Sequence, residues 1–500
     1  MSNIRRQSII SSVVVYVGFA LGLLNTYLFT RQGGFSKEQY GLTGTFIAIS
    51  NIMFSVASLG MPSYIGKFFP YYKAHLDDKK NDQLTWALLI PCLGFFVVVL
   101  LGIAFKHILI DKIFNNSPQL VYYYYWVFPF GFGYTIYMIL EAYAWQQRKA
   151  VLSTLLREVI FRVFVTVLIV LTTIGLIHTF NTFIGLYSFA YLFIILILVV
   201  YFRSQRKLTI TLSVSRVSRK FFKKILALIA WVWGGSLVFN IASVFGTIVI
   251  AAVLPNGMAA AAIYTLAQNI SSLIQAPQRA VISSSIGPLS QAWKDKNYKK
   301  INQVYHSSSI NQLIFSCAMF CLIWLNFEDG IYTFHIQGDY IPAKIIFLYI
   351  GLTRILDMGT GVNAQIIATS TFWRFELISG LILITITLPL NYEFTRYLGA
   401  VGPALSDLIT FAIYNFIRFM FLWNKFKMQP FTIKTLYTIV LAAFSYFVAY
   451  YIFKNNQGIV WIILRSSVFI IVYALGMFLL KLSPDALPVL NTIKKRLRLA

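Results

Sequence analysis

Long stretches without any charged residue dominate this sequence. No Asp, Glu, Lys or Arg occurs from Gln7 to Thr30, from Tyr40 to Gly66, or from Ile225 to Gln278, where only a turn signal, LPNG, interrupts the run. A hydrocarbon core of about 30 Å is crossed by about 20 helical residues. Membrane-spanning β-strands would instead give alternating segments of about ten residues, which are absent here. Only 12% of the residues are charged, against about a quarter in a soluble domain. The pattern predicts an all-α integral membrane protein.

The alternation of apolar runs and breaks predicts about 14 transmembrane helices. Lys and Arg are retained on the cytoplasmic side of a membrane, and a cytoplasmic N-terminus places most of them there. The external connections then hold only Arg31, Lys37, Lys106, Lys112, Lys344, Arg396 and Lys454. We therefore expect both termini to be cytoplasmic. The predicted helices lie near residues 8–30, 40–66, 84–105, 119–145, 152–177, 182–202, 225–253, 259–286, 306–327, 343–369, 374–393, 398–423, 435–453 and 459–481.

A strongly basic segment, residues 203–224, follows the sixth predicted helix and contains no acidic residue. It predicts a surface-lying amphipathic connector between two six-helix lobes, residues 1–202 and 225–424. Residues 425–500 would add two further helices and a basic cytoplasmic tail. The net charge of +26 is explained by short basic loops at an anionic leaflet, where each basic residue contributes about 1 kcal/mol of attraction. No nucleic-acid partner is needed, whereas membrane lipids are expected partners.

A weak internal repeat supports two halves. The second predicted helix of each half begins at a tyrosine after a turn that contains glycine, and ends in small residues and proline before a basic loop. Repeated bundles around a central site are common among transporters. With an offset of 224 residues, the matched pairs are Tyr40 and Tyr264, Leu42 and Leu266, and Asn51 and Gln275.

The chain resembles the polysaccharide transporters of the multidrug/oligosaccharidyl-lipid/polysaccharide flippase superfamily. The resemblance rests on fourteen predicted spans, cytoplasmic ends, the basic connector, and the segment YGLTGTFIAISNIMFSVASLGMPSYIGKF, which begins at Tyr40. This segment is similar to the family pattern of an aromatic-Gly start and a Leu-Gly end before a basic loop. The superfamily includes Wzx-type O-antigen flippases, the MurJ flippases and the multidrug extruders called MATE.

This resemblance implies a MATE-like pair of lobes around a V-shaped cavity in a bacterial inner (cytoplasmic) membrane. The implied activity is not enzymatic: alternating access would carry a polyprenyl-diphosphate-linked oligosaccharide to the outer leaflet, for lipopolysaccharide or another surface polysaccharide. The lipid-linked oligosaccharide is then the cargo, and a glycan polymerase or glycosyltransferases are further candidate partners. No cofactor or metal is expected.

Charged residues within spans usually face a wet cavity or one another. Arg354 and Asp357 lie three apart and so share a helix face, Asp407 lies in the outer half of its helix, and Arg279 follows Pro277. These four are the predicted substrate-binding group, with Arg279 as the main candidate for a phosphate contact. For Arg354 and Asp357, a neutralised ion pair is an equally good interpretation.

Neutral polar residues complete the predicted site. Asn51 and its repeat counterpart Gln275 are candidates for contacts with sugars, although polar side chains in spans more often form hydrogen bonds between helices. Other intramembrane charges lie closer to the surface in this interpretation. Glu158 and Arg162 would pair in a structural cluster with Arg157 and Glu141, and two more arginines would snorkel to the interface: Arg418 and Arg465.

Two other functions stay open. A cation-coupled drug extruder of the same fold would use an acidic residue in the first lobe, but the first three spans contain none. A membrane-embedded polysaccharide polymerase or ligase would place reactive residues on a large external loop, whereas the longest external connections here have roughly fifteen residues, a typical length. No nucleotide-binding or zinc motif occurs, so either the membrane potential or an ion at Asp357 or Asp407 would supply energy.

Overall fold

The computed structural model describes residues 3–208, 210–454 and 456–483. Every regular element of these described residues is a helix, and this confirms the all-α membrane fold class. Nine of the described helices are long and apolar enough to cross a membrane, or ten if one bent pair counts as a single span. The total of fourteen spans stays a prediction, as does the cytoplasmic placement of the termini. The predicted basic tail lies outside the described residues.

Contacts divide the chain into two compact units. Unit 1 comprises Met1–Thr265 and Asn391–Ala400, and unit 2 comprises Leu266–Leu390 and Val401–Ala500. The proposed lobe boundaries at residues 202 and 225 stay a prediction. In unit 1, helix α11 (Arg216–Val253) packs against α2 (Lys37–Ala57). The Nε1 of Trp233 on α11 donates a hydrogen bond to the carbonyl of Ser55 on α2, at 2.7 Å.

Most helices of unit 1 coincide with the predicted spans, although several spans consist of two or three consecutive helices. The remaining elements of this unit are α1 (Asn3–Thr30), α3 (Met61–His75), η1 (Asp78–Lys80), α4 (Gln83–Ala104), η2 (Ile108–Ile113), α5 (Pro118–Tyr122), η3 (Tyr124–Trp126), α6 (Val127–Gln146), α7 (Ala150–Leu155), η4 (Leu156–Ile160), α8 (Phe161–Thr173), α9 (Phe180–Ser188) and α10 (Ala190–Ser204).

The helices of unit 2 also follow the predicted order. They are α13 (Gln278–Lys294), α14 (Tyr298–Thr333), η5 (Gly338–Tyr340), α15 (Ala343–Gly359), α16 (Asn363–Thr369), α18 (Gly402–Phe426), α19 (Ile433–Ile452) and α20 (Ile459–Leu479). Two further helices and a short turn contain or adjoin the unit boundaries: α12 (Gly257–Ser271), α17 (Trp373–Leu398) and η6 (Gly399–Val401).

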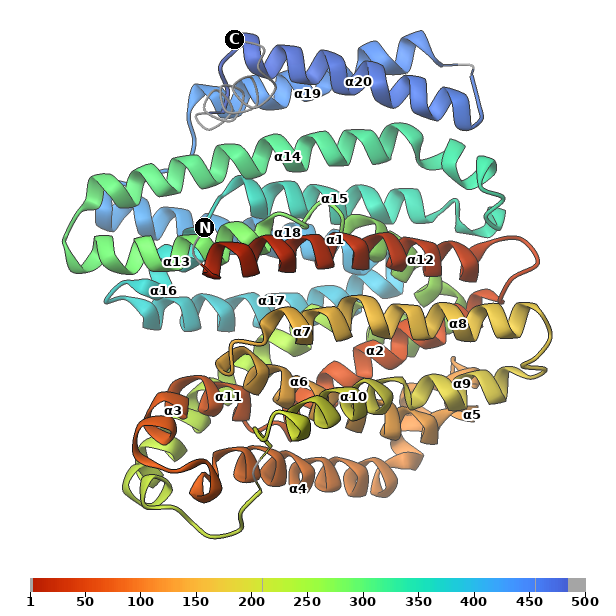
Figure 1. Ribbon diagram of the computed structural model, residues 1–500. Coiled ribbons are helices and arrows are strands. Elements are labelled where there is room, and N and C mark those ends of the chain that lie inside the picture. Colours follow the sequence, from red (N-terminus) through yellow and green to blue (C-terminus); the bar gives the residue numbers. More distant parts are fainter. Residues whose placement is uncertain (1–2, 209, 455, 484–500) are drawn as a thin grey trace. The chain divides into compact units, whose positions relative to one another are not determined.

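The two C-terminal helices form an antiparallel pair within unit 2. Figure 1 shows α19 and α20 in blue, side by side, and both pack against α14. Buried apolar side chains of the three helices make one core, in which Phe469 is fully buried. The hydroxyl of Tyr473 on α20 also donates to the carbonyl of Ile314 on α14, at 3.0 Å.

Three of the interrupted spans break near a residue that disfavours a regular helix. The span near 40–66 breaks between α2 and α3, where Gly60 has a φ of +72° and Pro62 follows. The span near 343–369 breaks between α15 and α16 with a bend of 47°, and Gly361 there has a φ of +66°. Glycine adopts this left-handed backbone conformation without a steric penalty.

The third interruption separates α12 from α13. From residue 273 to residue 276 the backbone N–H groups bond to carbonyls three residues earlier, as Gln275 does to Ser272, at 3.2 Å. These are 3₁₀-type bonds, and a 3₁₀ stretch inside a helix often marks a hinge. Pro277 follows and cannot donate a backbone hydrogen bond. Two half-helices therefore replace one continuous span.

The basic connector has two parts. The chain is irregular between the end of α10 and the start of α11, and the remaining basic residues form the first turns of α11. Hydrogen bonds attach the described residues of the irregular part to the rest of unit 1. The N–H of Thr211 donates to the Thr85 hydroxyl, and the N–H of Ser215 donates to the Asp82 carboxylate, both at 2.9 Å. Its placement on a membrane surface stays a prediction.

Candidate functional site

In unit 2, two interrupted spans meet at a carboxylate. Asp357 lies in the last turn of α15, and Gln278 is the first residue of α13. The side-chain Nε2 of Gln278 donates to Oδ2 of Asp357 at 2.8 Å, and Nδ2 of Asn415 on α18 donates to Oδ1 at 3.3 Å. The Asp357 carboxylate is thus held between three helices. Helix α15 ends beside it, α13 begins beside it, and α18 contributes Asn415. Irregular backbone at membrane depth marks ion and substrate sites in transporters.

A second layer of hydrogen bonds orients Asn415. Its Oδ1 accepts from the hydroxyl of Thr360 and from Nδ2 of Asn363, both at 2.9 Å. Thr360 and Asn363 flank the bend between α15 and α16. All three side chains are buried. Because Oδ1 of Asn415 is occupied by these donors, its amide nitrogen is directed to Asp357. The bend is therefore coupled to the carboxylate.

The structure places Arg279 next to this network. Arg279 is the second residue of α13, directly after Gln278, and its side chain is exposed. The first N–H groups of a helix have no intrahelical partner and carry partial positive charge. Gln275 lies in the 3₁₀-type stretch before this helix and is half-buried. The N-terminus of α13 and Arg279 thus both contribute positive charge at the start of this helix, next to the residue that contacts Asp357.

Arg354 and Asp357 share a face of α15, as predicted from their spacing. The Asp357 carboxylate accepts its described hydrogen bonds from Gln278 and Asn415, and not from Arg354. Within the part of the chain that the structure describes, the buried Nε of Arg354 has no hydrogen-bond partner. The ion-pair interpretation therefore finds no support in the geometry. Arg354 is able to donate to a ligand.

Asp407 lies on the same helix as Asn415. It lies on α18 eight residues before Asn415, which is about 12 Å along a helix axis at 1.5 Å per residue. Its side chain is half-buried. Among the described residues there is no group of three or more His, Cys, Asp and Glu that could hold a metal ion.

Two arginines that we expected to snorkel are buried in ion pairs instead. Arg418 on α18 pairs with Glu376 on α17 and lies over the ring of Tyr414, 3.7 Å from its centroid. Arg465 on α20 pairs with Asp329 on α14, and both side chains are buried. The expectation was wrong because carboxylates far away in the sequence meet both guanidinium groups. Buried charges need such partners.

In unit 1, Asn51 forms one hydrogen bond within its own helix and one to a neighbouring helix. Its Nδ2 donates to the carbonyl of Ile47 at 2.9 Å, and its Oδ1 accepts from the hydroxyl of Tyr134 on α6, also at 2.9 Å. Asn51 is half-buried. Tyr134 therefore links α2 to α6 through this amide, and a sugar contact by Asn51 would be additional to that role.

The cluster of charges in unit 1 forms as predicted. Arg157 bonds to Glu141 at 2.7 Å and to Glu158 at 3.2 Å, and Arg162 bonds to Glu158 at 3.0 Å. Two carboxylates thus balance two guanidinium groups. Arg157 and Glu158 lie on η4, a π-helical segment between α7 and α8, and such segments are frequent at functional sites.

Arg162 packs against α1. Glycines of α1 make room for it: a Cβ at either Gly18 or Gly22 would lie 3.2 Å from its Nη1. Both glycines lie inside the candidate span Val13–Thr30. Nδ2 of Asn25, also on α1, donates to the carbonyl of Arg162 at 2.9 Å. Arg162 therefore packs against α1, and its depth in a membrane stays a prediction.

Sequence reasoning missed Gln278, Asn415, Asn363 and Thr360, which surround Asp357. They are neutral, so no charge within an apolar run pointed to them. One signal was present for two of them, because Gln278 adjoins Arg279, and Asn415 lies two helical turns from Asp407. The exposed Arg279 and half-buried Arg354, in contrast, were found because charges in spans are rare.

No protein-family model matches this chain. No curated protein sequence matches it either. Solved structures do. One, the lipid II flippase MurJ in an inward closed conformation, has a TM-score of 0.74 at 16% identity and covers 94% of this chain and 98% of its own.

Two other similar structures belong to the MOP superfamily by their descriptions. An inward-facing multidrug resistance MATE family transporter has a TM-score of 0.61 at 17% identity, over 83% of this chain and 97% of its own. A transporter from Pyrococcus furiosus, described by a binding pocket of reverse polarity, has a TM-score of 0.54 at 14% identity, over 83% of this chain and 94% of its own. At these identities the similarity shows that the chain has the fold of these transporters.

Proposed function

We propose that the protein is a flippase that carries a polyprenyl-diphosphate-linked oligosaccharide from the cytoplasmic to the outer leaflet of a bacterial inner membrane. The observation that carries this proposal is the similarity to the MurJ flippase over 94% of this chain, against 83% for the MATE transporters. The product would serve the synthesis of a surface polysaccharide such as O-antigen, as in Wzx-like transporters. A glycan polymerase and glycosyltransferases are proposed partners.

The cargo defines what the site must do. An ionised diphosphate cannot cross hydrocarbon unaided, because its transfer would cost tens of kcal/mol by Born estimates. We assign the diphosphate to Arg279 and Arg354. The side chain of Arg279 is exposed, and within the described part of the chain the Nε of Arg354 has no hydrogen-bond partner. Gln275 and Asn51 would contact sugar hydroxyls, while the prenyl tail stays in lipid.

Asp357 is our candidate for the coupling ion or proton, with Asp407 the less supported choice. The Asp357 carboxylate accepts from two amide side chains and is connected through Asn415 to the bend at residues 360–362. A bound cation or proton would alter these hydrogen bonds and so the balance between conformations of the bend. The membrane potential, which supplies about 2.3 kcal/mol per charge per 100 mV, would favour outward movement of an anionic headgroup.

A cation-coupled drug extruder of the same fold is the second candidate, because MATE transporters share the architecture. Extruders of this type use an acidic residue in the first lobe. The buried Glu141 and Glu158 of unit 1 both bind arginines, which leaves their charge neutralised. Export of small cationic dyes by cells that express the protein would favour this candidate.

A polysaccharide polymerase or ligase is the least supported function. The connection between α14 and α15 is short, residues 334–342, and contains η5, and the similar structures are transporters. We therefore propose that the protein is not an enzyme. Extension of a glycan chain by the purified protein would contradict this.

Deletion of the gene tests the proposed function. We expect surface polysaccharide to fall and a polyprenyl-diphosphate-linked glycan to accumulate, because synthesis continues on the cytoplasmic side. The wild-type gene should restore surface polysaccharide, whereas Arg354→Ala should restore it poorly at equal protein abundance. Sensitivity to cationic dyes with unchanged surface polysaccharide would instead identify an extruder.

A further inference from the structure

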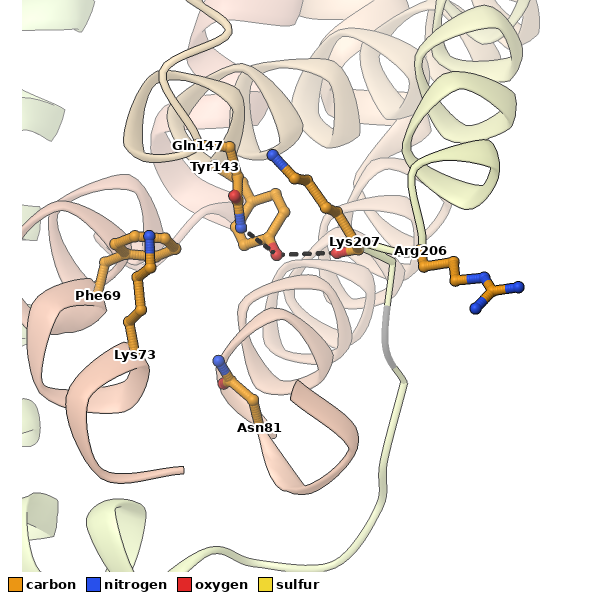
Figure 2. Close-up of a pocket in the computed structure, with 7 residues that line it drawn as sticks. All are labelled: Phe69, Lys73, Asn81, Tyr143, Gln147, Arg206 and Lys207. Atoms are coloured by element: carbon orange, nitrogen blue, oxygen red, sulfur yellow. Dashed lines mark hydrogen bonds between the residues drawn. The ribbon is translucent and has the colours of Figure 1, made fainter. Parts of the chain in front are cut away.

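A basic cavity occupies one end of unit 1, and none of the residues assigned to the cargo lines it. It has a volume of about 200 Å³ and lies where α3, α6 and α10 end (Figure 2). Its basic lining residues are Lys73, Arg206 and Lys207, and its neutral polar ones are Asn81, Tyr143 and Gln147. A water molecule occupies about 30 Å³ of liquid, so the cavity has room for a group several times larger.

A second cavity adjoins the first and adds a fourth cation. Its volume is about 340 Å³, it shares Phe69 and Lys73 with the first, and it is also lined by Arg148. Within the described part of the chain, no Asp or Glu lines either cavity. The neighbouring Asp82 is buried and already accepts from the backbone of Ser215. The combined cavity therefore carries an uncompensated positive charge.

Hydrogen bonds fix the cavity wall before any ligand binds. Figure 2 shows the hydroxyl of Tyr143 bonded to the carbonyl of Lys207, at 3.0 Å, and Nε2 of Gln147 bonded to that hydroxyl, at 2.9 Å. The first irregular residues of the connector are thus fastened to the end of α6. The backbone of Lys207 is therefore held in place at the cavity, so less backbone order must be gained on binding, whereas the Arg206 side chain extends away from Lys73 (Figure 2) and would have to turn toward a ligand.

Basic residues also occur at helix C-termini for a simpler reason, since they balance the partial negative charge there. Lys294 and Lys425 are examples in unit 2. The end of unit 1 differs because four cations from three chain segments line two adjoining cavities, the first of which also offers the amides of Asn81 and Gln147. That set of donors matches the oxygens of a phosphate.

The surroundings indicate a membrane lipid as the source of this phosphate. Trp145 and Tyr71, neighbours of the lining residues Gln146 and Pro70, are 53% and 46% exposed. Exposed aromatic side chains of this kind sit at the headgroup level of a bilayer. The bias of Lys and Arg predicts this end to be cytoplasmic, where the leaflet is anionic and basic pockets between helices bind lipid headgroups.

We propose that this cavity, the headgroup site, binds the phosphate of an anionic glycerophospholipid such as phosphatidylglycerol or cardiolipin. The site needs no cargo, so its occupation is independent of the proposed transport function. The bound lipid fastens the connector, through Lys207, to the ends of α3 and α6.

Lipid binding to the purified full-length protein tests this proposal. Four charges of the site are removed together in Lys73→Gln/Arg148→Gln/Arg206→Gln/Lys207→Gln. A matched control removes four exposed charges of α11 that do not line the cavity: Arg216→Gln/Arg219→Gln/Lys220→Gln/Lys223→Gln. Binding of phosphatidylglycerol, cardiolipin and phosphatidylcholine is measured in detergent for each protein, and elution profile and melting temperature check folding.

We expect the wild type and the control to retain phosphatidylglycerol and cardiolipin, and the site variant to bind them about tenfold or more weakly. Phosphatidylcholine should bind weakly to all three. Tyr143→Phe keeps every charge but loses the bond to the Lys207 carbonyl, and it should give an intermediate affinity if the site variant does not fold.

Two results would overturn the proposal. Equal losses in the site variant and the control would show that only net charge matters. Binding of undecaprenyl diphosphate or inorganic phosphate without binding of phospholipids would assign the site to another phosphate source. Because none of these readouts involves transport, their failure is distinguishable from failure of the proposed flippase function.

Discussion

The side-chain amide of Gln278 donates to the Asp357 carboxylate at 2.8 Å and joins the first residue of α13 to the last turn of α15. Both residues lie where a predicted span is interrupted. A continuous helix would satisfy its own backbone groups and would offer no such ends. The contact therefore connects two breaks in unit 2 through one charged group.

Replacement of this carboxylate by an amide should abolish most transport while leaving the fold intact. In Asp357→Asn the hydrogen bonds of Gln278 and Asn415 lose their charged acceptor, and bonds to charged groups contribute about 1.5–3 kcal/mol each. We expect surface polysaccharide, measured per amount of membrane protein, to fall about tenfold or more. Asp77→Asn, in an exposed loop, should have no effect. Equal activity of the two variants would remove Asp357 from the mechanism.

Arg279→Ala should lower surface polysaccharide without lowering protein abundance, because the exposed guanidinium is proposed to meet the diphosphate. Loss of one charge-assisted contact corresponds to about a tenfold effect. Arg279→Lys should retain part of the activity, since it keeps the charge but not the planar donor geometry. Arg396→Ala is the matched control, because Arg396 is half-exposed and its ion pair with Glu393 is long, at 4.0 Å. Unchanged output from Arg279→Ala would exclude this residue.

Gly41 should tolerate no side chain. A Cβ there would lie 1.9 Å from the carbonyl oxygen of Met258, so Gly41→Ala forces the backbones apart, and overpacking typically costs about 1–3 kcal/mol. Gly234→Ala meets open space in α11 and should stabilise by roughly 0.5–1 kcal/mol. Melting temperatures of the purified variants should therefore shift in opposite directions. A shift of the same sign and size would contradict the close contact at Gly41.

The buried pair of Arg465 and Asp329 should be important for stability and not for transport. Arg465→Ala leaves a buried carboxylate without its cation, which typically costs about 3–5 kcal/mol. We expect a clear fall in melting temperature. The double variant Arg465→Met/Asp329→Leu should recover much of it, because apolar side chains of similar volume often replace a buried pair without loss. No recovery in the double variant would show that the pair has a further role.

Much of the fold follows from the sequence because long apolar runs and basic loops are physically unambiguous. The predicted segment 84–105 corresponds to α4, Gln83–Ala104, and 459–481 corresponds to α20, Ile459–Leu479. The interruptions were harder to foresee. No charged residue occurs between α12 and α13, so the hydropathy of the sequence does not mark this break. Pro277 predicted a bend in the helix but not its interruption.

The candidate site was only partly predictable for a related reason. Charge identified Arg279, Arg354 and Asp357, but which atoms pair depends on contacts between helices distant in the sequence. Nothing near Asp357 in the sequence indicates that its partners are Gln278 and Asn415 rather than Arg354.

Reconstitution of the purified protein tests its proposed activity most directly. Proteoliposomes would contain a labelled polyprenyl-diphosphate oligosaccharide in both leaflets, and the fraction of glycan accessible to an external glycosidase would be measured over time. We predict that this fraction rises beyond the share of the outer leaflet with the wild type, and stays at that share with Asp357→Asn or without protein. An accessible fraction that is the same with and without the wild-type protein, under an imposed potential and ion gradient, would contradict the account.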